Sequence, residues 1–254
     1  MPTIKVENLS KYYNKRRFLW WHRKEREIGV EDINLTIEQG EFVFVIGSSG
    51  AGKSTLLNLI AGYEKPSKGA IYVNDQNLSV YRRSSQKKLP LLIGYVSQHH
   101  DLIRGITVEE NLELAAKAGR KRFDDGDDFE ERIQKVLGLV GLRDVQSRYP
   151  GELTAGECRR VELARALINS PPILVLDEVI ANLDADSMWD VFLLLQELNR
   201  RGTTVIMVTH NSRYVNMMHR RVITLVDGRI YSDETKGRYG EVSKKKTSND
   251  QIIL

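Results

Sequence analysis

Cysteine and long apolar runs are both scarce in this sequence of 254 residues. Its one cysteine, Cys158, excludes an internal disulfide and a cysteine-based metal cluster. The longest apolar runs, at 42–46, 173–176 and 205–208, are far shorter than the roughly 20 residues that a helix needs to cross a bilayer. Residues 1–5 lead directly into a strand-like pattern without an apolar secretory segment. We therefore expect a cytosolic chain that reaches a membrane only through a partner.

Charge is moderate overall but is concentrated in two segments. Charged residues make up 28% and hydrophobic residues 41%, which is ordinary for a soluble globular domain, and the net charge is +4. Residues 15–24 combine basic side chains with Trp20 and Trp21, and residues 244–246 are all lysine. Three interpretations of 15–24 stay open: solvated surface, contact with an anionic membrane or a juxtamembrane partner, and nucleic acid.

Strand-like and helix-like patterns alternate along the chain. We expect strands at 4–9, 33–37, 41–46, 70–73, 92–96, 173–176, 204–208 and 222–226. We expect helices after the 41–46 strand, at 109–118, at 129–139, from near Thr154 to before Pro171, at 187–200 and at 212–218. This alternation predicts an α/β fold whose core sheet is mostly parallel and covered on both faces. The helix-rich middle of the chain predicts an inserted helical lobe.

A phosphate-binding loop lies between the 41–46 strand and the helix after it. Residues 47–54 fit the pattern G-x-x-x-x-G-K-[ST], whose glycines let successive backbone N–H groups point at phosphate oxygens. In this pattern Lys53 supplies positive charge to the β- and γ-phosphates, and Ser54 offers a hydroxyl to Mg²⁺. The pattern predicts that ATP or GTP is bound by Gly47, Ser48, Ser49, Gly50, Ala51, Gly52, Lys53, Ser54 and Thr55.

Two acids, Asp177 and Glu178, follow the buried 173–176 strand. Ligands of open α/β sheets bind at the carboxyl ends of the strands, so both acids are expected at the ligand edge. Alone, such a pair is usually a solvated strand end. Together with the phosphate loop it predicts a hydrolytic site, in which Asp177 holds Mg²⁺ and Glu178 polarises the attacking water.

Five further segments occur in the order found in ABC ATPases, and nearly the whole chain resembles that family. Gln98 and His210 each follow a predicted strand, and Tyr13 lies in a K-x-aromatic pattern. Residues 153–157 read L-T-A-G-E where the family has its signature L-S-G-G-Q, and residues 182–184 read N-L-D, like its D-loop. Each segment is weak evidence by itself, whereas their common order is strong evidence.

The resemblance implies an ABC-type P-loop fold with antiparallel N-terminal strands. It implies an ATPase domain at 1–240 with a helical subdomain at about 98–168, followed by a polar tail at 241–254 that we expect to be mobile. Two copies would enclose two Mg-ATP molecules, with Tyr13 stacked on adenine and Gln98 also contacting a membrane subunit. The implied catalytic residues are Lys53, Gln98, Glu178 and His210, and the implied metal ligands are Ser54, Gln98 and Asp177. Beyond the phosphate loop and Tyr13, the implied nucleotide-binding residues are Thr154, Ala155, Gly156, Glu157 and Asp184; the signature would reach the ATP of the other copy, and Asp184 would lie at the dimer interface.

Within the family, the chain resembles the FtsE group of cell-division ATPases at 40–47, 169–174, 201–211, 221–225 and 227–230. That group implies a peripheral protein at the cytoplasmic face of a bacterial membrane. Its partner would be an FtsX-like integral membrane subunit that controls cell-wall hydrolases, with Trp20 and Trp21 as a further docking tip. Macrolide-exporter and lipoprotein-release ATPases share many of these residues, so a transporter motor remains the alternative. We expect no nucleic-acid partner, because soluble ABC ATPases that act on DNA or ribosomes usually carry a long coiled-coil insertion or a second ATPase domain.

The chain departs from the family pattern in two places. In the signature, Ala155 replaces a glycine, and its Cβ would cost about 1–2 kcal/mol if that position required a positive φ. Residues 154–157 also form a capping box, which starts a helix in any protein. After Glu178, residues 179–181 read V-I-A where the family has P-T-G or P-T-A. Because the metal and base residues remain, we expect hydrolysis to persist at a low rate; an ATPase that binds nucleotide and dimerises but turns over poorly is the alternative.

Overall fold

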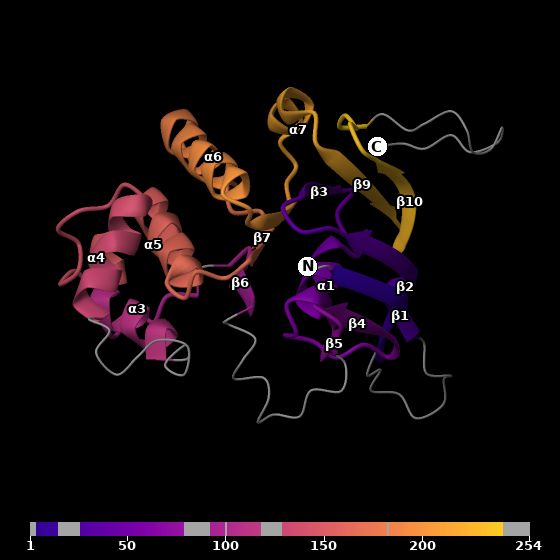
Figure 1. The fold of residues 1–254 in the computed structure, drawn as a ribbon, viewed down its shortest axis with the longest axis horizontal. Coiled ribbons are helices and arrows are strands. Elements are labelled where there is room, and N and C mark those ends of the chain that lie inside the picture. Colours follow the sequence, from indigo (N-terminus) through magenta and orange to yellow (C-terminus); the bar gives the residue numbers. More distant parts are fainter. Residues whose placement is uncertain are drawn as a thin grey trace, which may run out of the picture. The chain divides into compact units, whose positions relative to one another are not determined.

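A computed structural model describes residues 4–14, 26–78, 92–99, 101–117, 129–181 and 183–240. The chain divides into two compact units (Figure 1). A strand-rich unit comprises residues 1–81 and 207–254, and a helix-rich unit comprises residues 82–206. The basic-aromatic stretch 15–24 with its two tryptophans, Asn182 and the tail 241–254 lie outside the described residues.

An antiparallel sheet forms the N-terminal part of the strand-rich unit. Its strand order is β2 (Arg26–Ile37), β1 (Ile4–Asn14), β4 (Lys68–Val73) and β5 (Gln76–Asn77). Ile4 pairs with Ile37 on one side and with Val73 on the other. β1 and β2 are longer than the predicted strands. Register shifts interrupt their pairing, and because such bulges break the period-two pattern on which the prediction rested, the sequence indicated only part of each strand.

A second group of strands in the same unit carries the phosphate loop. β3 (Phe42–Ile46) is buried along its whole length and pairs in parallel with β9 (Arg221–Val226). α1 (Lys53–Ile60) follows β3, and α7 (Ser212–Met218) precedes β9. β10 (Arg229–Glu234) returns antiparallel to β9, and its mostly polar, half-exposed sequence explains why it was not predicted.

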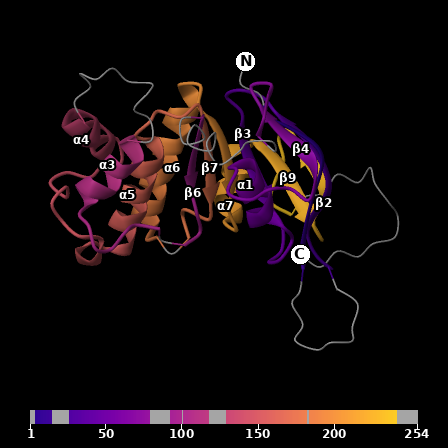
Figure 2. The same cartoon turned by 90° about the horizontal axis from the view of Figure 1, so that it is seen from below.

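The helix-rich unit contains the parallel pair β6 (Ile93–Val96) and β7 (Ile173–Asp177), with Val96 opposite Leu176. α3 (Val108–Lys117), α4 (Phe129–Leu139) and α5 (Ala155–Leu167) lie together (Figures 1 and 2). A short 3₁₀ helix (Pro150–Glu152) precedes α5, and α6 (Ala185–Arg200) leads toward β8 (Thr204–Val208), within which the division between the units falls.

Apolar side chains on one face of each helix explain the packing of α3, α4 and α5. Leu112, Ile133, Leu137 and Leu163 are all at most 2% exposed. Burying such side chains contributes about 1.5–3 kcal/mol each, which is what holds short helices like these in place. Across the described ranges, no helix combines the length and the apolar character that a bilayer crossing requires.

Candidate nucleotide site

The phosphate loop of the strand-rich unit depends on its glycines. Gly47, Gly50 and Gly52 have φ angles of 148°, 80° and 95°, which side-chain-bearing residues rarely adopt. A Cβ added to Gly47 would lie 2.3 Å from the carbonyl oxygen of Leu225, and one on Gly52 would lie 2.2 Å from that of Gly29. The curl of the loop therefore requires glycine at these two positions for reasons of space as well as φ.

Lys53 lies at the centre of this loop. Its side chain is largely buried, and Nζ donates to the carbonyls of Gly47 at 2.9 Å and Ser48 at 2.8 Å. At the start of α1, Gly52 provides no side-chain cap, and the first turn contains no acid. A lysine, uncapped first-turn N–H groups and the positive end of a helix together suit a phosphate group. Ser48, Ser49 and Gly50 at the tip of the loop are exposed.

Tyr13 lies next to the same loop. Its hydroxyl donates to both oxygens of Glu64, at 2.8 and 2.9 Å, and lies 3.4 Å from Oγ1 of Thr55. The ammonium of Lys11 lies 5.3 Å from the centre of its ring. Burial raises the pKa of Tyr13, so the phenol is neutral. The structure thus places an aromatic ring beside Thr55, and Glu64, which the sequence did not indicate, fixes its position.

In the helix-rich unit, the predicted residues Gln98 and Glu178 meet just beyond the ends of β6 and β7. Asp177 closes β7 and is 2% exposed, whereas Glu178 leaves the strand half-buried with a φ of 52°. Nε2 of Gln98 donates to Oε2 of Glu178 at 3.1 Å. The parallel pairing of β6 and β7 accounts for this contact, because it brings both carboxyl ends to one edge. A left-handed backbone at a residue other than glycine is a local strain of the kind found at functional sites.

The segment that resembles the signature forms the predicted capping box at the start of α5. Oγ1 of Thr154 accepts from the N–H of Glu157 at 3.2 Å, and Oε2 of Glu157 accepts from the Thr154 N–H at 2.8 Å. Hydrogen bonds from the N–H and the hydroxyl of Thr154 to Oε2, with Arg148 nearby, lower the pKa of Glu157, so the carboxylate is ionised at neutral pH. Ala155 is the first helical residue and has no positive φ, so the Cβ strain considered from the sequence does not arise.

Comparison with known proteins identifies the family of the chain. The family described as ABC transporter matches residues 30–181. The chain belongs to this family. It is 41% identical to the cell division ATP-binding protein FtsE of Bacillus subtilis over 82% of this chain and 90% of that protein. It is 40% identical to FtsE of Mycobacterium tuberculosis over 83% of this chain and 90% of that protein.

A solved structure gives the same family assignment. The dimeric structure of MJ0796, a bacterial ABC transporter cassette, aligns with a TM-score of 0.83 and 32% identity, over 93% of this chain and all of that one. The predicted fold, a parallel core sheet with antiparallel strands, is confirmed. This chain is therefore an ATPase of the ABC type.

Two other predicted residues of the ABC ATPase lie at element ends. Asp184 caps α6 by accepting from the N–H of Ser187 at 2.9 Å. Hydrogen bonds from the side chain and the backbone of Ser187 lower the pKa of Asp184. His210 is exposed after β8, and its Nδ1 lies 3.4 Å from the hydroxyl of Tyr239. Tyr239 lies 29 residues from His210 in the sequence and belongs to no motif, so the sequence contains no signal from which this contact could be predicted.

Within the described ranges no cluster of three or more His, Cys, Asp and Glu side chains could bind a metal by itself.

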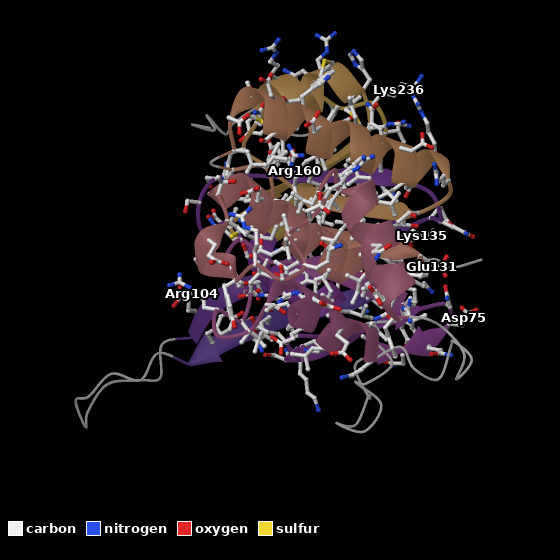
Figure 3. The ribbon with its side chains drawn as sticks, turned by 90° about the vertical axis from the view of Figure 1, so that its left-hand side faces the viewer. Asp75, Arg104, Glu131, Lys135, Arg160 and Lys236 are labelled. Atoms are coloured by element: carbon white, nitrogen blue, oxygen red, sulfur yellow. The ribbon has the colours of Figure 1, made fainter. Side chains whose placement is uncertain are left out.

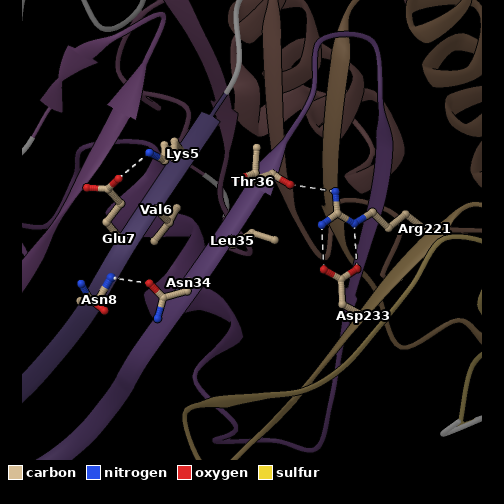
Figure 4. A pocket seen from close by; sticks show the side chains of 9 residues that line it. All are labelled: Lys5, Val6, Glu7, Asn8, Asn34, Leu35, Thr36, Arg221 and Asp233. Carbon is tan, nitrogen blue, oxygen red and sulfur yellow. Dashed lines mark hydrogen bonds and ion pairs between the residues drawn. The ribbon is translucent and has the colours of Figure 1, made fainter. Parts of the chain in front are cut away.

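A separate hollow of about 610 Å³ on the strand-rich unit holds none of the predicted residues (Figure 4). Arg221 lines it, donating to the carboxylate of Asp233 at 2.7 and 2.8 Å and to the carbonyl of Thr36 at 2.8 Å.

Proposed function

We propose that this ABC ATPase works as a homodimer that binds two Mg-ATP molecules and drives a conformational change in an FtsX-like membrane subunit. Through that subunit it would control cell-wall hydrolysis during division, from the cytoplasmic face of a bacterial membrane. The similarity to FtsE proteins supports the cell-division role. The observation that carries the mechanism is the hydrogen bond between Gln98 and Glu178, since it links the residue expected to sense the partner with the expected base.

Each unit supplies part of the proposed chemistry. In the strand-rich unit, the glycine-rich backbone and Lys53 would hold the phosphates, and Tyr13, which lies beside Thr55, would support the adenine ring. In the helix-rich unit, Glu178 orients and deprotonates the attacking water, and Gln98 sets the position of that carboxylate. His210, which is exposed after β8, would sense the γ-phosphate.

Mg²⁺ fits the proposed donor set. Ser54, Asp177 and Gln98 would hold it with hydroxyl, carboxylate and amide oxygens, the hard ligands that Mg²⁺ prefers. In phosphate sites this ion takes only one or two carboxylates and completes its shell with water and phosphate oxygens, so no larger acidic cluster is needed among the described residues. The bound ion would neutralise charge on the phosphoryl group that is transferred.

Dimerisation follows from the division of roles between copies. In the proposal, the start of α5 in one copy, Thr154 to Glu157, closes over the nucleotide held by the phosphate loop of the other. A two-fold arrangement of this kind buries the same surface on both chains. A structural relative, the ATP-binding cassette MJ0796, is dimeric in a post-hydrolysis state bound to ADP and phosphate, which supports this assembly. ATP then favours the closed pair, and hydrolysis releases it.

The identity of the membrane subunit tests the functional part of the proposal. We expect the tagged chain, expressed in its own cell and extracted in mild detergent, to bring down a four-helix membrane protein with a large extracellular loop. Depletion of the chain should disturb division. If the co-purified subunit instead moves a small molecule into proteoliposomes in an ATP-dependent manner, the chain is a transporter motor and the FtsX-like assignment is wrong.

A further inference from the structure

A buried ion pair on α5 holds the segment that carries Gln98. The side chains of Arg159 and Glu162 are 4% and 1% exposed, and Nη1 of Arg159 lies 2.8 Å from Oε2 of Glu162. The pair stands three residues apart on one face of the helix. Neither residue belongs to the signature or to any other motif predicted from the sequence.

The pair contacts three backbone groups between residues 97 and 101. Nη1 of Arg159 donates to the carbonyl of Ser97 at 2.8 Å, and Nη2 donates to the carbonyl of Gln98 at 3.0 Å. On the other side, Oε1 of Glu162 accepts from the N–H of Asp101 at 3.0 Å. The guanidinium therefore holds the backbone of Ser97 and Gln98, and the carboxylate holds that of Asp101. The side chain of Gln98, which this backbone carries, contacts Glu178.

Packing alone does not account for these charges. Removing two charges from water costs several kcal/mol per ion, and a well-packed apolar pair often stabilises a core equally well. Nε of Arg159 is buried and, among the described residues, has no hydrogen-bond partner, which adds a further cost. What an apolar pair cannot do is fix the carbonyls of Ser97 and Gln98 at a defined distance from the helix.

We propose that Arg159 and Glu162 are positioning residues for hydrolysis, which set the main chain of Gln98 and thereby the alignment of Glu178. The inference rests on the proposed roles of Gln98 and Glu178. It also connects two regions of the helix-rich unit. Arg159 lies four residues after the start of α5, about 6 Å along its axis, so a shift of this rigid helix when its first turn meets a nucleotide moves the Gln98 segment with it.

The test removes both charges together, in the variant Arg159→Gln with Glu162→Gln, because a single change would leave a buried charge unpaired. Arg132→Gln is the matched control. Arg132 is another arginine of the same unit that donates to main chain, at the carbonyl of Ile168 (2.9 Å), away from Gln98. It separates loss of positioning from general loss of packing.

Hydrogen exchange measures the contact between Glu162 and the Asp101 amide directly and does not depend on activity. We expect the Asp101 amide to exchange about tenfold faster or more in the double variant, since its charged acceptor is removed, and to be unchanged in the control. Equal exchange rates in wild type and double variant would show that the pair does not hold this segment. This arm keeps its meaning even if the chain shows no ATPase activity, which would refute the proposed function instead.

Kinetics then report the role in hydrolysis. We expect kcat to fall about tenfold in the double variant with KM for ATP unchanged. If the pair acts through Gln98, adding the double change to Gln98→Ala lowers kcat no further. Independent, multiplicative losses in that combined variant, or a wild-type kcat in the double variant, would show that the pair is only structural.

Discussion

Nε2 of Gln98 and Oε2 of Glu178 lie 3.1 Å apart, although 80 residues separate them in the chain. The two side chains stand at the ends of the paired parallel strands β6 and β7. This hydrogen bond gives the expected base a defined direction in the helix-rich unit. In the proposed mechanism, this bond also makes the base responsive to a movement of the Gln98 segment, whether Arg159 and Glu162 or a membrane subunit causes it.

Replacing Glu178 by glutamine keeps the shape of the site but removes the base. We expect ATP binding to persist and the single-turnover rate of hydrolysis to fall about a hundredfold or more. Glu130→Gln, in the first turn of α4, serves as the control. A rapid-quench measurement with labelled ATP checks the prediction, and a wild-type rate would show that Glu178 is not the base.

Lys53→Ala should weaken nucleotide binding about 10- to 150-fold. The ammonium is the charged donor within the phosphate loop, and losing such a contact to an anion costs about 1.5–3 kcal/mol. The matched control is Lys135→Ala, on the exposed face of α4 (Figure 3). Titration with a fluorescent ATP analogue gives both affinities. Equal affinity in the two variants would contradict the phosphate-loop assignment.

Adding a methyl group to the loop should destabilise the fold, whereas the same change in a helix should stabilise it. Gly47→Ala places a Cβ 2.3 Å from a backbone oxygen at a strained φ, and we expect a loss of about 1–3 kcal/mol in the free energy of unfolding. Gly138 lies inside α4, and a Cβ added there would meet no atom within 4 Å beyond its chain neighbours and its own helix backbone. Gly138→Ala should therefore raise the free energy of unfolding by about 1 kcal/mol. Urea unfolding measures both, and the same sign for both would refute the loop geometry.

The ionised Glu157 should make stability depend on acid pH. Its pKa is lowered in the folded state, so its stabilising contribution is present above the unfolded pKa of about 4.3 and is lost as pH falls through the lower folded value. Glu157→Gln keeps an acceptor for the capping box but not the charge. The difference in unfolding free energy between wild type and variant should therefore shrink from pH 7 to pH 3. A constant difference would mean that the charge is not engaged.

Much of the fold could be predicted because it follows local patterns. The buried β3 strand, the glycine loop and α1 are adjacent in sequence, and the bounds of α4 were predicted without error. β10 was missed because its polar residues carry no alternation. In the same way, bulges concealed the length of β1, where a positive φ at Asn8 interrupts the pairing.

Contacts within the candidate site could not be predicted from the sequence. Gln98 and Glu178 were each expected from a motif, yet their hydrogen bond depends on how β6 and β7 pair. Arg159 was not expected, because its partners are main-chain oxygens some 60 residues away and no sequence pattern marks a backbone atom. Tyr239 approaches His210 in the same unmarked manner.

The mass of the Glu178→Gln variant in solution, measured by light scattering with and without Mg-ATP, tests the central claim most directly. Because this variant should bind ATP without hydrolysing it, we expect Mg-ATP to shift it from one chain of 29.1 kDa to twice that mass, and Lys53→Ala in the same chain to abolish the shift. A single-chain mass at saturating Mg-ATP and high protein concentration would contradict the account.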